Sequence, residues 1–201
     1  MVIVPKKTLM KKTGIIIAIV VGVVLLWGIG AYHGLGKKQD AVTKAGSQVE
    51  NVYQRRADLV PNLVALVKNY AEYEQGTILA VTEARTKAAS TTVNIENYTE
   101  GDLQNFEHSQ EALGQSMNRL LVAVENYPDL KASENYLTLQ AQLAGCENRI
   151  LTERQRFNET AKVYNQSVRK FPSSLIANLF GFEKRPYFEA EAGADKAPTT
   201  F

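Results

Sequence analysis

The apolar positions of this chain begin with an unbroken run from Gly14 to Tyr32, GIIIAIVVGVVLLWGIGAY. The run contains no charge, no proline and no amide side chain, whereas a soluble core helix of this length would show a polar face. About 20 apolar residues in a helix cross the hydrocarbon core of a bilayer, because each residue rises ~1.5 Å and the core is ~30 Å thick. We therefore predict a transmembrane helix over residues 14–32.

A cleaved signal peptide is the alternative interpretation of the same run. The run is longer than the ~7–15 residues of a usual signal-peptide apolar region. The small residues near its end, Gly28, Gly30 and Ala31, form a poor cleavage site. Both observations favour a retained anchor.

After Lys37 the pattern becomes that of amphipathic helices, with apolar residues at alternating steps of three and four. The first seam consists of Val42, Ala45, Val49, Val52, Arg56, Leu59, Leu63, Leu66 or Val67, and Tyr70. It continues weakly through Thr77, Val81 and Ala84, so we predict one long helix to about Ala89. Because the phase is kept on both sides of Pro61, this proline should kink the helix rather than end it.

Two further helices are predicted after a loop over residues 90–101, which has no steady period. Asp102 is the expected N-cap of the second helix. The seam of this helix is Leu103, Phe106, Gln110, Leu113, Met117, Leu120 and Val124. A short turn at residues 126–129 leads into the third helix, from about Asp129 to Arg169. The third seam is Leu137, Gln140, Leu143, Glu147, Ile150, Arg154, Phe157, Ala161, Tyr164 and Val168.

The last part of the chain predicts a stop, a short helix and a tail. Phe171-Pro172 should end the third helix, and residues 173–180 should form a short helix that ends at Gly181. Residues 189–201 are small, acidic and proline-containing, so we expect them to be disordered. Since short turns make long helices antiparallel neighbours, the predicted fold class is all-α. It comprises the transmembrane helix and an antiparallel up-and-down helical bundle over residues 37–188, with three long helices and a short C-terminal one.

Charge is distributed unevenly over the 201 residues, whose formal net charge is +2. The basic N-terminal flank, residues 1–13, holds Lys6, Lys7, Lys11 and Lys12, and no acidic residue occurs before Asp40. Subtracting these four lysines from the 23 basic residues leaves 19 against all 21 acidic residues, a net charge of −2. The bundle therefore lacks the basic excess typical of nucleic-acid binding, and nucleic acid is not an expected partner.

The same flank predicts how the chain lies in a membrane. The lysines beyond the span, Lys37, Lys38 and Lys44, are fewer and are mixed with Asp40. The positive-inside bias therefore places the N-terminus in the cytoplasm and the bundle outside it. A start at Met10 stays open as an alternative, and it would weaken this asymmetry.

Few residues are suited to metal binding or nucleophilic chemistry. Cys146 is the single cysteine, which excludes an intrachain disulfide. The histidines are His33 and His108, too few with one cysteine for a Cys/His zinc site. We expect no metal and no cofactor.

Small residues recur at steps of four in the span, at Gly14, Ala18 and Gly22. Such a stripe lets two spanning helices approach closely and predicts a homo-oligomer. The alternative is that glycine is simply common in membrane spans.

Four polar residues occupy seam positions where apolar ones are expected: Arg56, Gln110, Glu147 and Arg154. A lone buried charge is costly, so these groups should be paired or partly exposed. A polar layer that fixes helix register is one interpretation, and a binding site for a partner or a small ligand is the other. A catalytic carboxylate site is the least favoured, because no second acid lies at a matching seam position. The candidate face consists of Arg55, Arg56, Asp58, Asn62, Glu147, Asn148, Arg149 and Arg154.

Several ordered motifs resemble the bacterial LemA family. After the short span come QVENVYQRRADLVPNLV (48–64), VTEAR (81–85), LQAQLAGCENRI (139–150), ERQRFNETAKVYN (153–165) and an FP…GF…YF pattern (171–188). The resemblance implies an up-and-down helical bundle on a single-pass anchor, with no established enzymatic activity and no cofactor. It also implies association with membrane peptidases and envelope processes. Family topology has been described in both directions, so the resemblance does not determine orientation.

These observations lead to two functional hypotheses. The first is a non-enzymatic scaffold or adaptor in the bacterial inner membrane, which contacts the lipid bilayer and a protein partner in the cell envelope, such as a membrane peptidase system. The second is a sensor that binds a small ligand between its helices and signals through the transmembrane helix.

Overall fold

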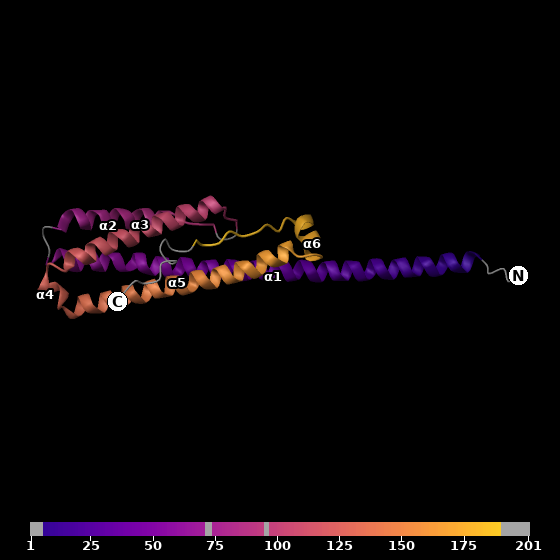
Figure 1. Cartoon of the computed structure of the whole chain (residues 1–201), viewed down its shortest axis with the longest axis horizontal. Helices are drawn as coiled ribbons and strands as arrows, with labels where there is room; N and C mark the ends of the chain where they lie inside the picture. The colour runs from indigo at the N-terminus through magenta and orange to yellow at the C-terminus, as the bar shows by residue number, and fades with distance from the viewer. Residues whose placement is uncertain (1–5, 71–73, 95–96, 190–201) are drawn as a thin grey trace, which may run out of the picture. The chain divides into compact units, whose positions relative to one another are not determined.

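The computed structural model describes residues 6–70, 74–94 and 97–189, with side chains from residue 14 onward. Its helices are, in chain order, α1 (Lys6–Lys68), α2 (Gln75–Ser90), α3 (Glu100–Val124), α4 (Pro128–Lys131), α5 (Glu134–Arg169) and α6 (Ser173–Phe180) (Figure 1). No strand occurs in the described ranges, and the predicted all-α helical bundle is confirmed. Of the predicted disordered segment 189–201, residues 190–201 lie outside them, whereas Glu189 is described.

The chain divides into two compact units. We call the first, Met1–Asp40 with Val163–Lys184, the anchor unit. We call the second, Ala41–Lys162 with the chain from Arg185 onward, the bundle unit. Helices α1 and α5 each contribute residues to both units.

The anchor unit contains the long apolar run predicted to cross a membrane. Within the described chain, α1 is the helix that is long and apolar enough to do so, and none of its most apolar window is buried. Leu25 and Leu26, for example, are 62% and 72% exposed. A continuous apolar surface of this kind needs a lipid or protein environment. In the same unit, Lys38 Nζ donates to Ser167 Oγ at 2.5 Å and so joins α1 to α5.

The bundle unit is organised around the seam of α3. All seven residues predicted for this seam are buried, and Leu113 and Leu120 have no exposed surface. Full burial of one such side chain stabilises a fold by about 1.5–3 kcal/mol. Helices α2 and α3 lie side by side (Figure 1). Arg85 of α2 donates to the carbonyl of Ala57 in α1 at 2.9 Å, which ties a third helix to the pair.

The predicted length of the first helix is wrong. Helix α1 ends at Lys68 instead of continuing to Ala89, and α2 begins at Gln75. Pro61 stays inside α1, as expected. The apolar spacing survives the break, because Ile78, Val81 and Ala88 of α2 are buried. A heptad pattern therefore could not distinguish one long helix from two helices that both pack on the core.

The helix starts also differ from the predictions. Thr99, not Asp102, is the N-cap of α3, and Asp102 completes a capping box by accepting from the Thr99 backbone N–H at 2.9 Å. The hydrogen bonds from Thr99 lower the pKa of Asp102. The third predicted helix begins as α4 and restarts at Glu134. Ser133 marks this break, since its hydroxyl accepts from Tyr136 N–H at 3.3 Å.

Two seams differ from the prediction by one position at some of their members. In α5, Leu137 is 52% exposed and Gln140 is exposed, while Tyr136 and Leu139 are buried. In α1, the buried residues are Tyr53 and Val60, where the periodicity had placed Val52 and Leu59. Tyr70, a predicted member of the first seam, is 46% exposed. In α1 the predicted Arg56 and Leu63 are also buried, so the buried face of this helix is wider than a single line of heptad positions.

Helix α6 has the predicted span, but its N-cap is Pro172 and not Ser173, the residue that the sequence favours as the cap. It spans Ser173–Phe180 and stops at Gly181, whose φ of 73° lies in the left-handed region that favours glycine. The cap is closed by a hydrogen bond from Phe182 N–H to the carbonyl of Ala177 at 2.9 Å.

Candidate functional site

Arg56 is the most deeply buried charge of the candidate face, with 4% of the residue exposed. Its guanidinium donates to Glu147 Oε1 at 3.0 Å and to both the backbone carbonyl and Oε1 of Gln110, at 2.7 and 3.0 Å. Gln110 in turn donates to the Ala88 carbonyl at 3.5 Å. One arginine of α1 is thereby linked to α3, α5 and, through Gln110, to α2. These contacts are what a polar layer that fixes helix register requires.

The surroundings of Arg56 are shaped for its side chain. A Cβ added at Gly114 of α3 would lie 3.5 Å from Arg56 Nη1, so a longer side chain there would displace the guanidinium. The centroid of the Tyr53 ring lies 5.1 Å from Cζ of Arg56, within the range of a cation–π interaction. Burial raises the pKa of Tyr53, although the nearby arginines oppose the shift. The Nε atom of Arg56 is buried and has no hydrogen-bond partner among the described residues.

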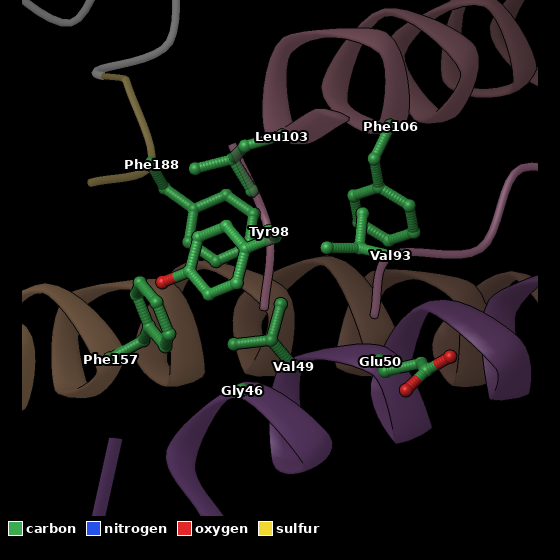
Figure 2. Close-up of a pocket in the computed structure, with 9 residues that line it drawn as sticks. All are labelled: Gly46, Val49, Glu50, Val93, Tyr98, Leu103, Phe106, Phe157 and Phe188. Carbon is green, nitrogen blue, oxygen red and sulfur yellow. The ribbon is translucent and has the colours of Figure 1, made fainter. Parts of the chain in front are cut away.

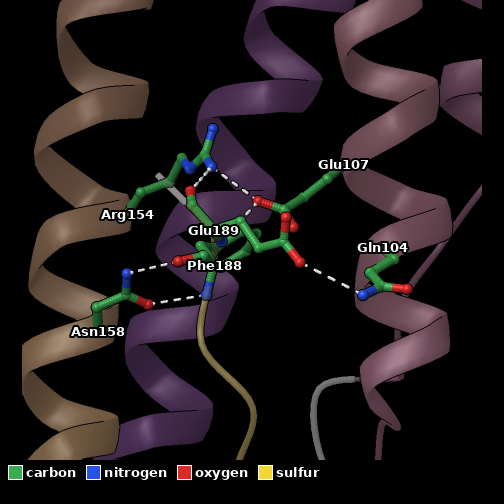
Figure 3. A network of polar contacts seen from close by, with 6 residues as sticks. All are labelled: Gln104, Glu107, Arg154, Asn158, Phe188 and Glu189. Atoms are coloured by element: carbon green, nitrogen blue, oxygen red, sulfur yellow. Dashed lines mark hydrogen bonds and ion pairs between the residues drawn. The ribbon is translucent and has the colours of Figure 1, made fainter. Parts of the chain in front are cut away.

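Arg154 belongs to a second network, at the edge of the bundle (Figure 3). It donates to Glu107 Oε1 at 2.7 Å and to the backbone carbonyl of Glu189 at 2.5 Å. Glu107 Oε1 also accepts from the Glu189 backbone N–H at 3.2 Å. Burial raises the pKa of Glu107, and the attraction of Arg154 opposes this rise. Arg154 and Glu107 therefore bind both backbone polar groups of Glu189.

The segment that these residues hold is Arg185–Glu189, which we call the C-terminal strap. Asn158 of α5 pairs its side-chain amide with the Phe188 backbone, donating to the carbonyl and accepting from the N–H at 2.9 Å each (Figure 3). The Phe188 ring packs edge-on against Phe157, with ring centroids 5.0 Å apart. At the other end of the strap, the Tyr98 hydroxyl donates to the Pro186 carbonyl at 3.4 Å. The bundle thus binds a non-helical chain segment by its backbone and one aromatic side chain.

A small apolar cavity lies beside the strap (Figure 2). Its volume is about 20 Å³, room for roughly one water molecule. Phe157, Phe188, Tyr98, Phe106 and neighbouring aliphatic residues line it. Burial strongly raises the pKa of Tyr98, which keeps its hydroxyl protonated as a donor. This cavity is a packing gap and is too small for a ligand.

A much larger open cleft lies between α3 and α5, with a volume of about 640 Å³. Tyr53 and Arg56 of α1 contribute to its wall, together with the Glu189 end of the strap. The residues of α3 and α5 that line it are Glu107, Gln110, Glu111, Gly114, Gln115, Met117, Asn118, Leu121, Gln140, Leu143, Ala144, Glu147, Ile150 and Arg154. Residues of both polar networks therefore line the same cleft.

The predicted candidate face is divided by the structure. Arg56, Glu147 and Arg154 line the cleft, although Glu147 and Arg154 bond to different partners. The other five predicted residues are exposed and are absent from the cleft lining: Arg55, Asp58, Asn62, Asn148 and Arg149. Asp58 instead accepts from Gln54 of the same helix at 2.8 Å.

Glu107, Asn158 and the strap are functional features that the sequence pattern did not predict. Glu107 and Asn158 lie next to the seam residues Phe106 and Phe157, so an acid or amide at the margin of a seam was the available signal. The strap has no periodicity that would place it against a particular helix.

Metal chemistry has no obvious site in the described part of the chain. No group of three or more His, Cys, Asp or Glu side chains there could hold a metal ion. Cys146 is buried, with 3% exposed. Glu147, the acid at a predicted seam position, is paired with Arg56.

Comparison with known proteins places these features in a family. The magnetosome protein MamQ of Magnetospirillum gryphiswaldense is 28% identical over 174 residues, covering 78% of this chain and 64% of MamQ. MamQ 2 of Paramagnetospirillum magneticum is 26% identical over 166 residues, covering 74% of this chain and 61% of that protein. This chain thus spans less than two thirds of those relatives. Protein LemA of Metamycoplasma hominis is 21% identical over 170 residues, covering 85% of this chain and 74% of its own length. The LemA family matches residues 45–201, more than half of the chain, and the protein therefore belongs to the LemA family.

Proposed function

We propose that this membrane-associated protein is a non-catalytic adaptor of the bacterial cell envelope, whose bundle binds a segment of a protein partner in the cleft between α3 and α5. The observation that carries the proposal is the cleft of about 640 Å³, on which both arginine networks converge. The cleft runs along α5 from Gln140 to Arg154, a distance of about 21 Å at ~1.5 Å per residue. An elongated groove of this length suits a chain segment.

The charges in the cleft indicate the chemistry of that segment. Four acids, Glu107, Glu111, Glu147 and Glu189, line it against the two arginines, Arg56 and Arg154, so the lining carries a net charge of −2. Both arginines are already paired with acids of this set. The partner segment should therefore present basic side chains. Met117, Leu121 and Leu143 also line the cleft and would receive apolar side chains beside them.

The strap supports this proposal, because it is itself a chain segment bound by the bundle. The bundle already holds a non-helical segment next to the cleft, using Asn158 and Arg154 on its backbone and an aromatic pocket for Phe188. Main-chain hydrogen bonds combined with a side-chain pocket are a general mode of peptide recognition. A membrane peptidase system is a partner that the family resemblance suggests.

Site-specific photo-crosslinking in intact cells tests the proposal. A photoreactive residue at Gln115, which is exposed and lines the cleft, should form a discrete protein adduct. Glu111→Lys should reduce the yield of this adduct, because it reverses an exposed acid of the cleft. The adduct peptide identified by mass spectrometry should contain basic residues.

Glu83→Lys is the matched control for this experiment. Glu83 is an exposed acid of α2 outside the cleft lining, so its reversal should leave the adduct unchanged. A photoreactive residue at Arg55, also outside the cleft, should not give the same adduct. Equal adducts from both photoreactive positions, or equal losses with both charge reversals, would sink the assignment of the cleft.

A ligand-binding sensor is the second candidate, and the cleft volume favours it. Small-molecule sites are commonly ~300–1,000 Å³, and this cleft falls in that range. A sensor would change its helix packing on binding. Hydrogen exchange of the α3 and α5 amides, compared before and after addition of a low-molecular-weight cell extract, would reveal that change. Unaltered exchange would leave the adaptor as the better description.

We also propose a single-pass topology with the N-terminus in the cytoplasm and the bundle outside it. The basis is the lysine excess before the span and the apolar exposed surface of α1. Protease digestion should cleave the bundle in cells whose outer barrier has been opened and spare it in sealed inverted membrane vesicles. The opposite pattern would reverse the topology.

A further inference from the structure

Helix α6 exposes an unusual amount of apolar surface for so short an element. Leu175 and Leu179 are 58% and 75% exposed, and Phe171, just before the helix, is 76% exposed. The helix carries no charge. Patches of this kind on a soluble surface are normally covered by something.

The position of α6 within the anchor unit indicates what covers it. The Ile176 side chain lies 3.7 Å from where a Cβ of Gly28 would be. The ring centroids of Phe180 and Phe182 lie 4.9 and 5.6 Å from the ring centroid of Tyr32. Gly28 and Tyr32 belong to the last turn of the apolar run predicted to span the membrane. Helix α6 therefore packs against α1 where the apolar run ends (Figure 1).

The depth of this contact matches the membrane interface. Gly28 lies about 6 Å before Tyr32 along α1, at ~1.5 Å per residue. Helices that lie in the interface bury their apolar face roughly 5–10 Å into the boundary between headgroups and acyl chains. Tyr32 and the nearby Trp27 are also the residue types that collect at this level.

The two faces of α6 fit the same environment. Leu175 and Leu179, one turn apart, share an exposed face, whereas Ser174 and Asn178 lie on a neighbouring polar face. Ile176 and Phe180 point to α1. Exposed basic residues flank the helix, Arg169 and Lys170 before it and Lys184 after it, where anionic headgroups would be.

We propose that α6 lies in the membrane interface and inserts Leu175, Leu179 and Phe171 into the acyl region of the bilayer that α1 spans. This inference rests on the proposed membrane anchor. The bilayer covers the apolar face because the face continues the exposed apolar surface of α1 at the end of the span. The contact gives the protein a second hold on the lipid surface.

Fluorophores attached to single introduced cysteines test the inference in the full-length protein. Variants Leu179→Cys and Asn178→Cys are labelled with a polarity-sensitive dye and reconstituted in vesicles of phosphatidylcholine and phosphatidylglycerol. Both positions are exposed, so neither label displaces core residues, and the unmodified chain with its buried Cys146 gives the labelling background. Lipids brominated on their acyl chains should quench the Leu179 label about twofold more than the Asn178 label, since one face enters the acyl region and the other does not.

A third label, on Val24→Cys in the exposed apolar run, tests the proposed membrane anchor independently of α6. Quenching at Val24 and Leu179 by brominated lipid, with the Asn178 label quenched instead by aqueous iodide, supports the inference. Quenching at Val24 with equal iodide access at Leu179 and Asn178 overturns it and leaves the anchor intact. A Leu179 label reached by neither quencher would also overturn it, because a second copy or a partner would then cover the face. No lipid quenching at Val24 would contradict the anchor itself.

Discussion

Arg56 and Arg154 both occupy predicted seam positions, yet they act on different kinds of structure. Arg56 is almost completely buried and donates to Gln110 of α3 and Glu147 of α5. Arg154 keeps 14% of its side chain exposed and donates to Glu107 and to the backbone of the strap. The first arginine thus joins helices to one another, while the second also joins a helix to a segment without regular structure.

The difference indicates which network the fold needs and which one it can release. A buried arginine that donates to a backbone carbonyl constrains how far one helix can slide along another, because the donor and acceptor positions are both fixed. The strap contacts involve only Arg185–Glu189 of the C-terminal chain, so we expect the seams of α1, α3 and α5 to stay in place when these contacts are lost. Sub-global opening of such a segment is expected to require less free energy than unfolding of the core.

The largest expected effect is the loss of Arg56. Arg56→Ala leaves a cavity and removes hydrogen bonds to Gln110 and Glu147, and we expect the free energy of unfolding to fall by about 3 kcal/mol. Arg154→Ala, which removes the more exposed of the two arginines, should cost about 1 kcal/mol. Urea unfolding of the full chain in detergent micelles, followed by far-UV circular dichroism, compares the two. Arg55→Ala, on the exposed neighbour, should change the value by less than about 0.5 kcal/mol. Equal costs for Arg56 and Arg154 would contradict the distinction between them.

Gly114 tests the same buried network from the opposite helix. Gly114→Leu should displace the Arg56 guanidinium and lower the free energy of unfolding by about 2 kcal/mol, as overpacking does elsewhere. Gly114→Ala places its methyl group at an ordinary contact distance of 3.5 Å, and alanine favours the helix by about 0.5–1 kcal/mol. The same urea series should therefore give opposite signs for the two variants. A stabilising leucine would mean that Arg56 has room that this packing does not allow.

Asn158→Ala tests how much the hydrogen bonds to the strap contribute to holding it in place. The change removes both amide contacts to Phe188, each worth about 1 kcal/mol, so the strap should open more often. Hydrogen exchange of the Phe188 and Glu189 amides should accelerate roughly tenfold or more. Amides in the buried centre of α3, such as that of Leu113, serve as the internal reference and should not change. Accelerated exchange at Leu113 as well would show that the strap is part of the cooperative core.

The smallest expected effect concerns the pH response of Glu107. Burial raises its pKa above the ordinary value near 4.5, so the folded chain takes up this proton at a higher pH than the unfolded chain does. The free energy of unfolding of the wild type, relative to Glu107→Gln, should therefore rise as the pH falls through the raised pKa towards the ordinary one. Urea unfolding of both proteins across this range measures the difference. A difference that falls with falling pH would show that the attraction of Arg154 outweighs burial.

The sequence predicted part of the bundle closely, because some signals are local. In α3 the seam from Leu103 to Val124 is complete, and every member is buried. In α6 the start after Phe171-Pro172 and the stop at Gly181 were both legible, since proline and glycine act through their own backbone. The burial of Arg56 and Gln110 was also foreseeable as a polar layer in two apolar seams.

Other features depended on contacts between segments far apart in the sequence. The break between α1 and α2 preserved the apolar spacing, so periodicity could not reveal it. Glu147 and Arg154 share a helix face seven positions apart, but Arg56 and Glu107 are the residues that pair with them. Pairing partners follow from the rotation and axial position of neighbouring helices, which a pattern along one helix does not contain.

The sequence by itself determined the all-α class, the exposed apolar helix suited to a membrane and the polar residues within the seams. These follow from the composition and period of single segments, which set what each helix must bury. The tertiary structure decided that Arg56 links the helices, that Asn158 and Arg154 hold the strap, and that a cleft opens between α3 and α5. Each of these depends on distances between atoms that are 30 or more positions apart along the chain, and such distances exist only once the helices have packed.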